Sequence, residues 1–357
     1  MVRITRFKLA VAAALALLLT TFTVFPGANA AYGSRLQPAQ ATRQIEQHRQ
    51  SGNGQPVANL DPTYTYGQPV LWEDPVDIES RDLFYGIGGR DGAPDPSAPF
   101  TYVRRQKSGT QKKIIVEDNR GREWTVKFGP EARPETAATR IVWAVGYHVD
   151  QDYFVPWARI IGKKNIDARD VRFERRDDGY KEIGNWSWES NPFLGTREFE
   201  GLKVLMALLK NWDLVERNND ILTRKKGSGP HIYYVADLGG TFGRTGTFLN
   251  GMPLFGNMPA TVTFSPDKAK GDPYAFTGER FIKEVRGGRV YFNIRRAHSR
   301  DRVNGVSVEC ARWMGVLLGR LSDKQLADAF CASGYDRAET ALYVSILRAR
   351  ILELQQL

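Results

Sequence analysis

Apolar and polar positions divide the chain into a strand-rich part followed by a helix-rich part. Short apolar runs between turn residues predict antiparallel strands from Asp82 onward. Longer runs with the spacing of one helix face predict helices, which dominate toward the C-terminus. This pattern predicts an α+β protein. The predicted strands are Phe100–Arg104, Ile114–Glu117, Arg122–Phe128 and Ile232–Ala236, and the predicted helices include Pro134–Gly146, Phe199–Leu209 and Ser307–Leu321.

Capping residues mark where several of these helices begin and end. Pro134 suits a first helical turn, Glu135 suits the positive end of the helix dipole, and Gly146 suits a C-terminal cap. The pairs Ser322–Gln325 and Asp336–Glu339 have the spacing of capping boxes, so two further helices are expected to start there.

The N-terminal segment, residues 1–30, has the features of a signal peptide. Basic residues precede an apolar stretch from Leu9 to Val24, and Ala28-Asn29-Ala30 forms an A-x-A cleavage site. The stretch is short for a membrane-spanning helix, so we expect cleavage after Ala30, a periplasmic or secreted protein and no stable membrane insertion. Residues 31–75, rich in Gln, Pro, Gly and Asn, are predicted to be a flexible leader.

The chain carries a net charge of +10, and its first 30 residues hold three basic and no acidic residues, which leaves +7 on the mature chain. This excess is compatible with an anionic ligand. Basic residues are interspersed with acidic ones and form no basic stripe with stacking aromatics. No nucleic-acid partner is therefore expected.

The two cysteines, Cys310 and Cys331, are expected to form a disulfide if the protein is exported. The chain has four histidines, and none lies close in sequence to either cysteine. A thiol nucleophile and a Cys/His metal site are therefore not expected.

Asp213, Asn218 and Asp237 form the pattern that points most directly to chemistry. In phosphoryl transfer a carboxylate orients the acceptor hydroxyl, while an amide and a second carboxylate hold magnesium. The catalytic loop of protein kinases has the same offset of five between Asp and Asn, and a metal-binding Asp follows in D-F-G. Here N-W-D stands in place of H-R-D, and D-L-G in place of D-F-G.

A second pattern lies upstream, where Lys127 ends a predicted strand and Glu135 opens the next predicted helix. Kinases use a strand lysine for the nucleotide phosphates and a helix glutamate to hold that lysine. Glu131 is an alternative to Glu135, and Asn219 is an alternative to Asn218. Taken singly, each residue also fits a surface ion pair or a turn, so the interpretation depends on their order along the chain.

Gly86, Gly88 and Gly89 precede the first strands and are candidates for a loop that covers phosphates. They lack the G-x-G-x-x-G spacing, and glycine clusters also mark ordinary turns.

From about Asp82 to Leu357 the chain resembles the atypical protein-kinase-like superfamily, which includes HipA-like, phosphatidylinositol-kinase-like and secretory-pathway kinases. It also resembles a group of exported bacterial proteins that carry the V-K-x-G, P-E-T, N-W-D and D-L-G pieces. The resemblance implies a two-lobed kinase-like fold, with a small antiparallel β N-lobe carrying one helix over residues 76–165 and a larger, mostly helical C-lobe over residues 166–357.

The resemblance also implies that ATP with Mg or Mn binds between the lobes. Lys127 would contact the phosphates with Glu135 positioning it, and Asp213 would orient the hydroxyl of an unknown protein, glycan or small-molecule acceptor. Asn218 and Asp237 would hold the metal.

Three functional hypotheses remain open at the level of sequence. ATP is scarce outside the bacterial cytoplasm, so an exported kinase would need a particular source of donor. The first hypothesis is an active kinase, and the second is a pseudokinase-like binding module without catalysis. The third is an exported hydrolase with Asp213 and Asp237 as paired carboxylates. The pairing of Lys127 with Glu135 argues against the third, because a hydrolase has no use for that pair.

Overall fold

The computed structural model describes residues 67–106, 112–243, 271–277, 280–294 and 297–357. The chain divides into two compact units at residue 61, and all described residues belong to the second unit. The predicted signal peptide and leader residues 31–66 lie outside the described residues.

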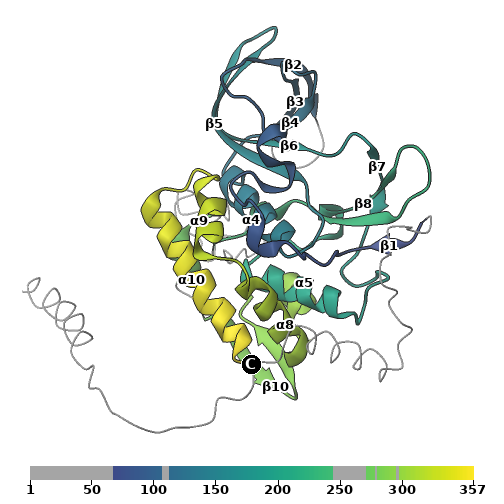
Figure 1. The fold of residues 1–357 in the computed structure, drawn as a ribbon, viewed down its shortest axis with the longest axis vertical. Helices are drawn as coiled ribbons and strands as arrows, with labels where there is room; N and C mark the ends of the chain where they lie inside the picture. The colour runs from purple at the N-terminus through teal and green to yellow at the C-terminus, as the bar shows by residue number, and fades with distance from the viewer. Residues whose placement is uncertain (1–66, 107–111, 244–270, 278–279, 295–296) are drawn as a thin grey trace, which may run out of the picture. The chain divides into compact units, whose positions relative to one another are not determined.

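Strands β2 to β6 close into a barrel in the order β2-β3-β4-β6-β5 (Figure 1). Trp124 and Val126 of β4 are fully buried in its interior. Because successive side chains of a strand point to opposite faces, Lys127 leaves the barrel interior on the other face. This alternation positions the lysine of the candidate site. The strands are β2 Phe100–Gln106, β3 Lys113–Glu117, β4 Glu123–Lys127, β5 Gln151–Ile161 and β6 Ile166–Arg175.

Helix α4, Ala132–Ala144, connects β4 to β5 and confirms the predicted helix after Lys127. Pro134 lies in its first turn, and Gly146 follows its end with a φ of +95°. The helix packs against β5 and β6 of the barrel and against α9, Asp323–Cys331. Contacts on several sides explain why nearly every residue of α4 is buried.

The barrel continues past residue 165, where the sequence had placed the end of the N-lobe. Strand β6 pairs with β5 from Ile166 to Arg175 and also with β4. A division at 165/166 therefore falls between two paired strands, and the barrel ends at Arg175. Strand β5 is joined to β6 by a short turn over residues 162–165, whereas the pairing with β4, which closes the barrel, joins residues distant in sequence.

A second sheet has the order β1-β9-β8-β7, and it includes a segment predicted to be flexible. Strand β1, Pro69–Val70, pairs in parallel with β9, and Leu71 is buried. The Trp72 indole Nε1 donates a hydrogen bond of 2.6 Å to the Val145 carbonyl. Residues 67–75 therefore belong to the fold and not to a flexible leader. The other strands are β7 Tyr180–Asn185, β8 Asn219–Arg224 and β9 His231–Val235.

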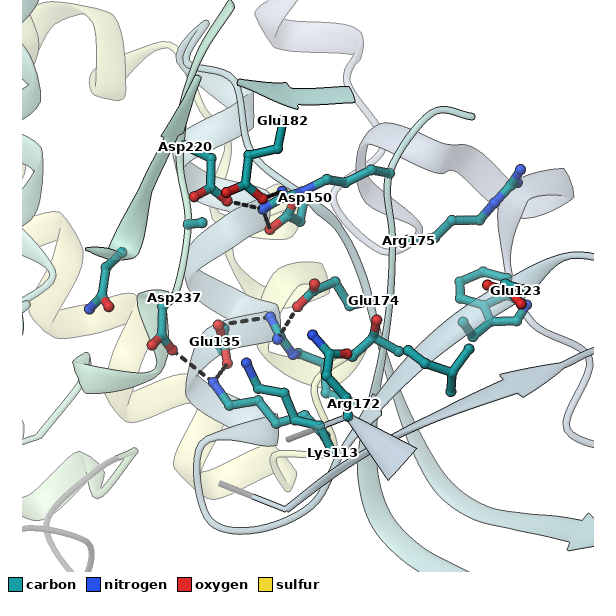
Figure 2. Close-up of a pocket in the computed structure, with 18 of the residues that line it drawn as sticks. Lys113, Glu123, Glu135, Asp150, Arg172, Glu174, Arg175, Glu182, Asp220 and Asp237 are labelled. Carbon is teal, nitrogen blue, oxygen red and sulfur yellow. Dashed lines mark hydrogen bonds and ion pairs between the residues drawn. The ribbon is translucent and has the colours of Figure 1, made fainter. Parts of the chain in front are cut away.

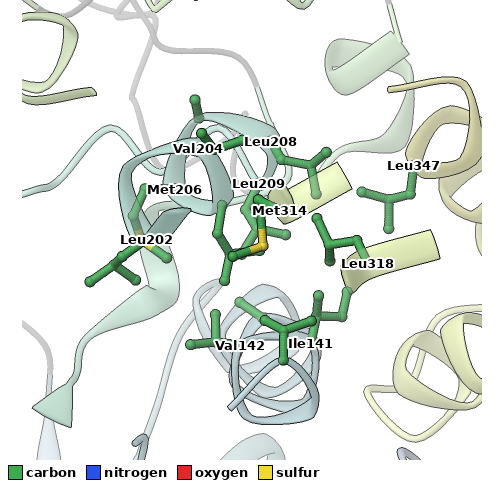
Figure 3. Close-up of a cluster of buried hydrophobic side chains, with 14 of the residues drawn as sticks. Ile141, Val142, Leu202, Val204, Met206, Leu208, Leu209, Met314, Leu318 and Leu347 are labelled. Carbon is green, nitrogen blue, oxygen red and sulfur yellow. The ribbon is translucent and has the colours of Figure 1, made fainter. Parts of the chain in front are cut away.

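The C-terminal part is built mainly from helices around an apolar core. Figure 3 shows Ile141 and Val142 of α4 facing Leu202 and Met206 of α5, together with Met314 and Leu318 of α8 and Leu347 of α10. Both predicted capping boxes are confirmed, at Ser322 and Asp336. The principal helices are α5 Arg197–Leu208, α8 Val308–Gly319, α9 and α10 Arg337–Gln355.

Shorter elements complete the described part of the chain. A small sheet has the order β10-β11-β12, and short helical turns flank the strands. These elements are η1 Ile78–Ser80, η2 Gly86–Gly88, α3 Gly89–Gly92, η3 Glu216–Asn218, η4 Leu238–Gly240, α6 Pro273–Thr277, β10 Ile282–Arg286, β11 Arg289–Phe292, α7 Ala297–Val303 and β12 Val306–Ser307.

The α+β class and the two-lobed arrangement predicted from the sequence are confirmed by these elements. The smaller lobe is the barrel with α4, and the larger lobe combines the second sheet with the helices. Within the described residues, every helix is too short or too polar to cross a membrane.

The predicted disulfide is wrong, because Cys310 and Cys331 are both free. Cys310 lies in the first turn of α8, whereas Cys331 is the last residue of α9. Helix α8 packs against α5 and α10, while α9 packs against α4 and α10. The two helices therefore do not form the closely packed hairpin that a staple between them requires.

Candidate active site

A cavity of about 1140 Å³ is lined by the outer face of the barrel and by the β7-β8-β9 side of the larger lobe. Its wall is strongly charged. The cavity brings together five of the predicted site residues, which come from four separate segments of the chain: Lys127, Glu135, Asp213, Asn218 and Asp237. Figure 2 shows Glu135, Arg172 and Asp237 as a connected group within it.

The Lys127 ammonium lies among three carboxylates. Its Nζ is 2.9 Å from Glu131 Oε2, 2.9 Å from Glu135 Oε2 and 2.7 Å from Asp237 Oδ1. Burial lowers the pKa of Lys127, but the carboxylates outweigh burial and hold that pKa above its ordinary value. Lys127 is therefore a permanently charged group, and both candidate glutamates contact it.

Arg172 provides Glu135 with a second cation. Its Nη1 lies 2.8 Å from Glu135 Oε1 and 2.8 Å from Asp152 Oδ2, and it also pairs with Glu174. Arg172 of β6 is the direct neighbour of Lys127 across the β4–β6 pairing. Burial raises the pKa of the Glu135 carboxyl above its ordinary value, while Arg172 and Lys127 favour the ionised form. Glu135 is thus held between two cations.

The loop that carries Asp213 is fixed by hydrogen bonds on both sides of this residue. The Asp213 amide donates to Asn211 Oδ1 over 3.0 Å, and Asn218 Nδ2 donates to the Asp213 carbonyl over 2.9 Å. The Trp212 amide donates to the Gly240 carbonyl over 3.2 Å. The loop therefore has its own anchors in place of the histidine and arginine of H-R-D.

Asp237 follows β9 in the left-handed conformation, with a φ of +50°. Aspartate tolerates this region better than most residues. Burial raises the pKa of Asp237, but Lys127 outweighs burial and the resulting pKa lies below its ordinary value. The following glycine, Gly239, allows a close approach, since a Cβ atom there would lie 2.7 Å from Glu131 Cβ. Asp237 is therefore an ionised ligand candidate on the cavity wall.

The structure separates Asn218 from its alternative, Asn219. Asn219 is buried and donates to the Trp186 carbonyl over 3.2 Å, away from the cavity. Asn218 lines the cavity, and its Nδ2 donates to the Asp213 carbonyl, so the metal role predicted for it would fall to its amide oxygen. Carboxylate and amide oxygens suit Mg²⁺, so Asn218 and Asp237 fit the predicted metal role.

Carboxylate oxygens of Glu131, Glu135 and Asp237 also lie within 4.8 Å of one another, which is a spacing that a metal ion could use. The Lys127 ammonium already contacts all three of these residues. We therefore interpret this cluster as a lysine site.

The glycines at 86, 88 and 89 are not among the residues that line the cavity. Gly86 and Gly89 have φ values of +71° and +61°, and the Tyr153 hydroxyl donates to the Gly89 carbonyl over 3.0 Å. Their placement does not support the predicted phosphate contact. They form a turn that packs on Tyr153, and turn glycines give the same sequence signal as a phosphate-covering loop.

Replacing Gly88 by alanine is expected to lower the free energy of unfolding by about 1–3 kcal/mol, because the new Cβ would overpack the site. That atom would lie 2.0 Å from the Tyr153 hydroxyl oxygen. Urea unfolding would measure the loss, and adding Tyr153→Phe should recover part of it. A Gly88→Ala variant of unchanged stability would contradict this packing.

Sequence reasoning missed the group around Arg176, at the end of the cavity where the chain leaves the barrel. Arg176 Nε lies 2.5 Å from Asp150 Oδ1, and the same guanidinium pairs with Asp220 of β8 and, at 3.7 Å, with Glu182 of β7. Arg176 thus links the barrel to the second sheet. Each residue alone looks like an ordinary surface charge, so no local signal indicates the group.

No family model matches the chain, and no curated protein matches it. Among solved structures, the chain is similar to the proinflammatory kinase CtkA of Helicobacter pylori, with 11% identity and a TM-score of 0.43 over 72% of this chain and 95% of that one. It is also similar to the Rio2 kinase of Chaetomium thermophilum, solved with ADP/Mg²⁺ and phosphoaspartate, with 14% identity and a TM-score of 0.30 over 73% of each chain.

The order of elements in the described chain is the kinase-like order expected from the sequence. A barrel strand carries the lysine, the next helix carries its glutamate, and a loop with Asp213 and Asn218 precedes β8 and β9, after which Asp237 follows. The predicted site residues, which lie far apart in the sequence, therefore line one cavity.

Proposed function

We propose that the chain is an exported kinase-like phosphotransferase that uses ATP with Mg or Mn. The observation that carries the proposal is the contact of Lys127 with both Glu135 and Asp237, in the cavity that Asp213 and Asn218 also line. Phosphoryl transfer depends on positioning and on charge stabilisation, and these are the residue types it uses. The acceptor is a hydroxyl group of a protein, glycan or small molecule.

Each residue has a distinct role in this proposal. Lys127, fixed by Glu135, binds phosphate oxygens, and Asp213 orients the acceptor hydroxyl and takes its proton. Asn218 and Asp237 would hold the metal, which would neutralise charge on the phosphates. Hydrogen bonds on both sides of Asp213 support a fixed orientation of this residue. Positioning of the reacting groups supplies a large part of the rate acceleration in such reactions.

The contacts of Asp237 make it unsuited to the acid role in a hydrolase with paired carboxylates. Such enzymes need one carboxyl group that can be protonated near neutral pH. Asp237 is paired with Lys127, which helps to hold its pKa below the ordinary value. The anchoring of the Asp213 loop by Asn211 likewise disfavours the pseudokinase hypothesis, because the loop stays ordered without H-R-D.

The test is a thermal-shift titration of the mature chain with ATP, with and without Mg²⁺ or Mn²⁺. Ligand at about 100 times its dissociation constant adds about 2.7 kcal/mol of stability. We expect a metal-dependent shift in the wild type that is lost in Asp237→Asn, because an amide replaces an ionised ligand. Asp167→Asn is the matched control, since Asp167 is exposed on β6 and does not line the cavity.

Wild type and Asp237→Asn are compared by the change in melting temperature that ATP and metal produce in each protein. Their absolute melting temperatures are not compared, because Asp237→Asn also removes the ion pair with Lys127. A shift of equal size in Asp237→Asn and the wild type would remove Asp237 from the metal role. The absence of any shift in the wild type, with either metal, would overturn the proposed function.

A further inference from the structure

Strands β3 and β4 place two lysines side by side on the cavity wall. Lys113 and Lys127 are direct partners in the antiparallel register of these strands, and both line the cavity. Side chains at directly opposed positions share one face of the sheet, where like charges destabilise the pair. Figure 2 shows Lys113 on the same wall as Arg172 and Glu135. The fold therefore holds two cations together at this point.

The two lysines differ in their partners. Lys127 contacts three carboxylates at distances of 2.7 to 2.9 Å. Lys113 is half-buried, and among the described residues its ammonium makes no hydrogen bond and no ion pair within 4 Å, although its charge acts at longer range on Glu174 and Asp237. The nearby acidic groups are already engaged, because Glu135 and Glu174 pair with Arg172, and Asp237 pairs with Lys127. Lys113 is therefore a half-buried cation that no described carboxylate contacts directly, which makes it complementary to an anion that enters the cavity.

We propose that Lys113 is a second phosphate-binding residue, which contacts oxygens of the nucleotide's polyphosphate chain beside Lys127. The inference rests on the proposed function and assigns to that site a residue that no sequence motif marks. A lysine ammonium is a compact point charge that suits phosphate oxygens. The polyphosphate then supplies the close anionic contact that Lys113, unlike Lys127, does not have in the described structure.

The adjacent residue offers a matched control. Lys112 carries the same charge on the same hairpin, but it is exposed, lies over the Phe128 ring at 4.7 Å and does not line the cavity. Lys112→Met and Lys113→Met therefore remove the same charge from two adjacent positions, of which only Lys113 lines the cavity. Lys113→Arg keeps the charge in the cavity.

The experiment is calorimetric titration of the mature chain and its variants with Mg-ATP and with adenosine. We expect Lys113→Met to raise the dissociation constant for Mg-ATP by roughly tenfold or more, as for the loss of a charged hydrogen bond. The dissociation constant for adenosine should not change. Lys112→Met should differ from the wild type by less than about twofold, and Lys113→Arg should retain most of the affinity.

Thermal unfolding without ligand provides a second readout. Removing Lys113 relieves repulsion with Lys127 and also removes longer-range attraction to Glu174 and Asp237, so Lys113→Met is expected to melt close to the wild-type temperature. A residue with a merely structural role would lower both stability and affinity.

Three outcomes would overturn the inference. They are unchanged Mg-ATP affinity in Lys113→Met, an equal loss in Lys112→Met, and an equal loss for adenosine. In each of these the wild type binds nucleotide and the proposed function survives. A wild type that binds no nucleotide with Mg²⁺ or Mn²⁺ is a different result, which rejects the proposed function and the Lys113 contact together.

Discussion

Asp213→Asn is expected to lower the rate of phosphoryl transfer by about 10²–10⁴-fold, the usual contribution of a positioned general base. The asparagine can keep the backbone hydrogen bonds with Asn211 and Asn218, so the loop should retain its shape. It cannot take a proton from the acceptor hydroxyl. Autophosphorylation and hydrolysis of labelled ATP measure the rate without knowledge of the acceptor.

The same variant should bind Mg-ATP with the affinity of the wild type, because Asp213 contributes to the reaction and not to holding the nucleotide. Asp167→Asn again serves as the control for the loss of one negative charge. An Asp213→Asn protein that turns over at the wild-type rate would exclude Asp213 as the base. One that no longer binds nucleotide would assign Asp213 a binding role.

Lys127→Met is expected to lower the free energy of unfolding by about 3–5 kcal/mol, the usual cost of removing one partner from a buried ion pair. Glu135 is fully buried and would keep Arg172 as its cation, whereas Glu131 and Asp237 would lose the ammonium that they share. Mg-ATP binding should weaken as well, since the phosphates lose their principal contact. Urea unfolding at pH 7 measures the first effect.

The stability deficit of Lys127→Met should depend on pH in a defined direction. Lys127 helps to hold the folded-state pKa of Asp237 below its ordinary value. This part of the wild-type stability is present above the unfolded-state pKa of about 3.9, and it is lost as the pH falls through the folded-state value. The deficit should therefore be smaller at about pH 3, below the unfolded-state pKa, than at pH 7. A deficit below about 1 kcal/mol at both pH values would contradict a buried role for this lysine.

Local signals in the sequence were sufficient to select the residues that we propose for the chemistry. The turn before β4, the proline at the start of α4 and the glycines after Asp237 indicated a strand lysine, a helix glutamate and a loop aspartate. Each of these signals depends on a few neighbouring residues. Their order along the chain can be read from the sequence without knowledge of the fold. The structure adds that all of them line one cavity.

The residues that sequence reasoning missed act through partners distant in sequence. Arg172 pairs with carboxylates on α4 and β5. Arg176 pairs with carboxylates on β7 and β8 and with one just before β5. No short motif encodes such pairs. Contacts between residues distant in sequence also explain why the barrel ends at Arg175, since β6 pairs with β4. They likewise explain the two free cysteines, because α8 and α9 pack against different helices. Gly86 and Gly89 lie outside the cavity, and their signal is ambiguous because a positive φ in a turn favours glycine whether or not a phosphate is present.

The pairing of β1 with β9 also has a consequence for how the chain folds during synthesis. Strand β1 leaves the ribosome early, but its partner at His231–Ile232 is made only after the whole barrel. Closing so long a loop is costly in entropy, and domains begin to fold from the N-terminus as they are made. The barrel can therefore form first, and β1 docks afterward and covers the edge of β9. A chain that begins at Val76 lacks this cover and leaves an open strand edge, which is a known route to aggregation.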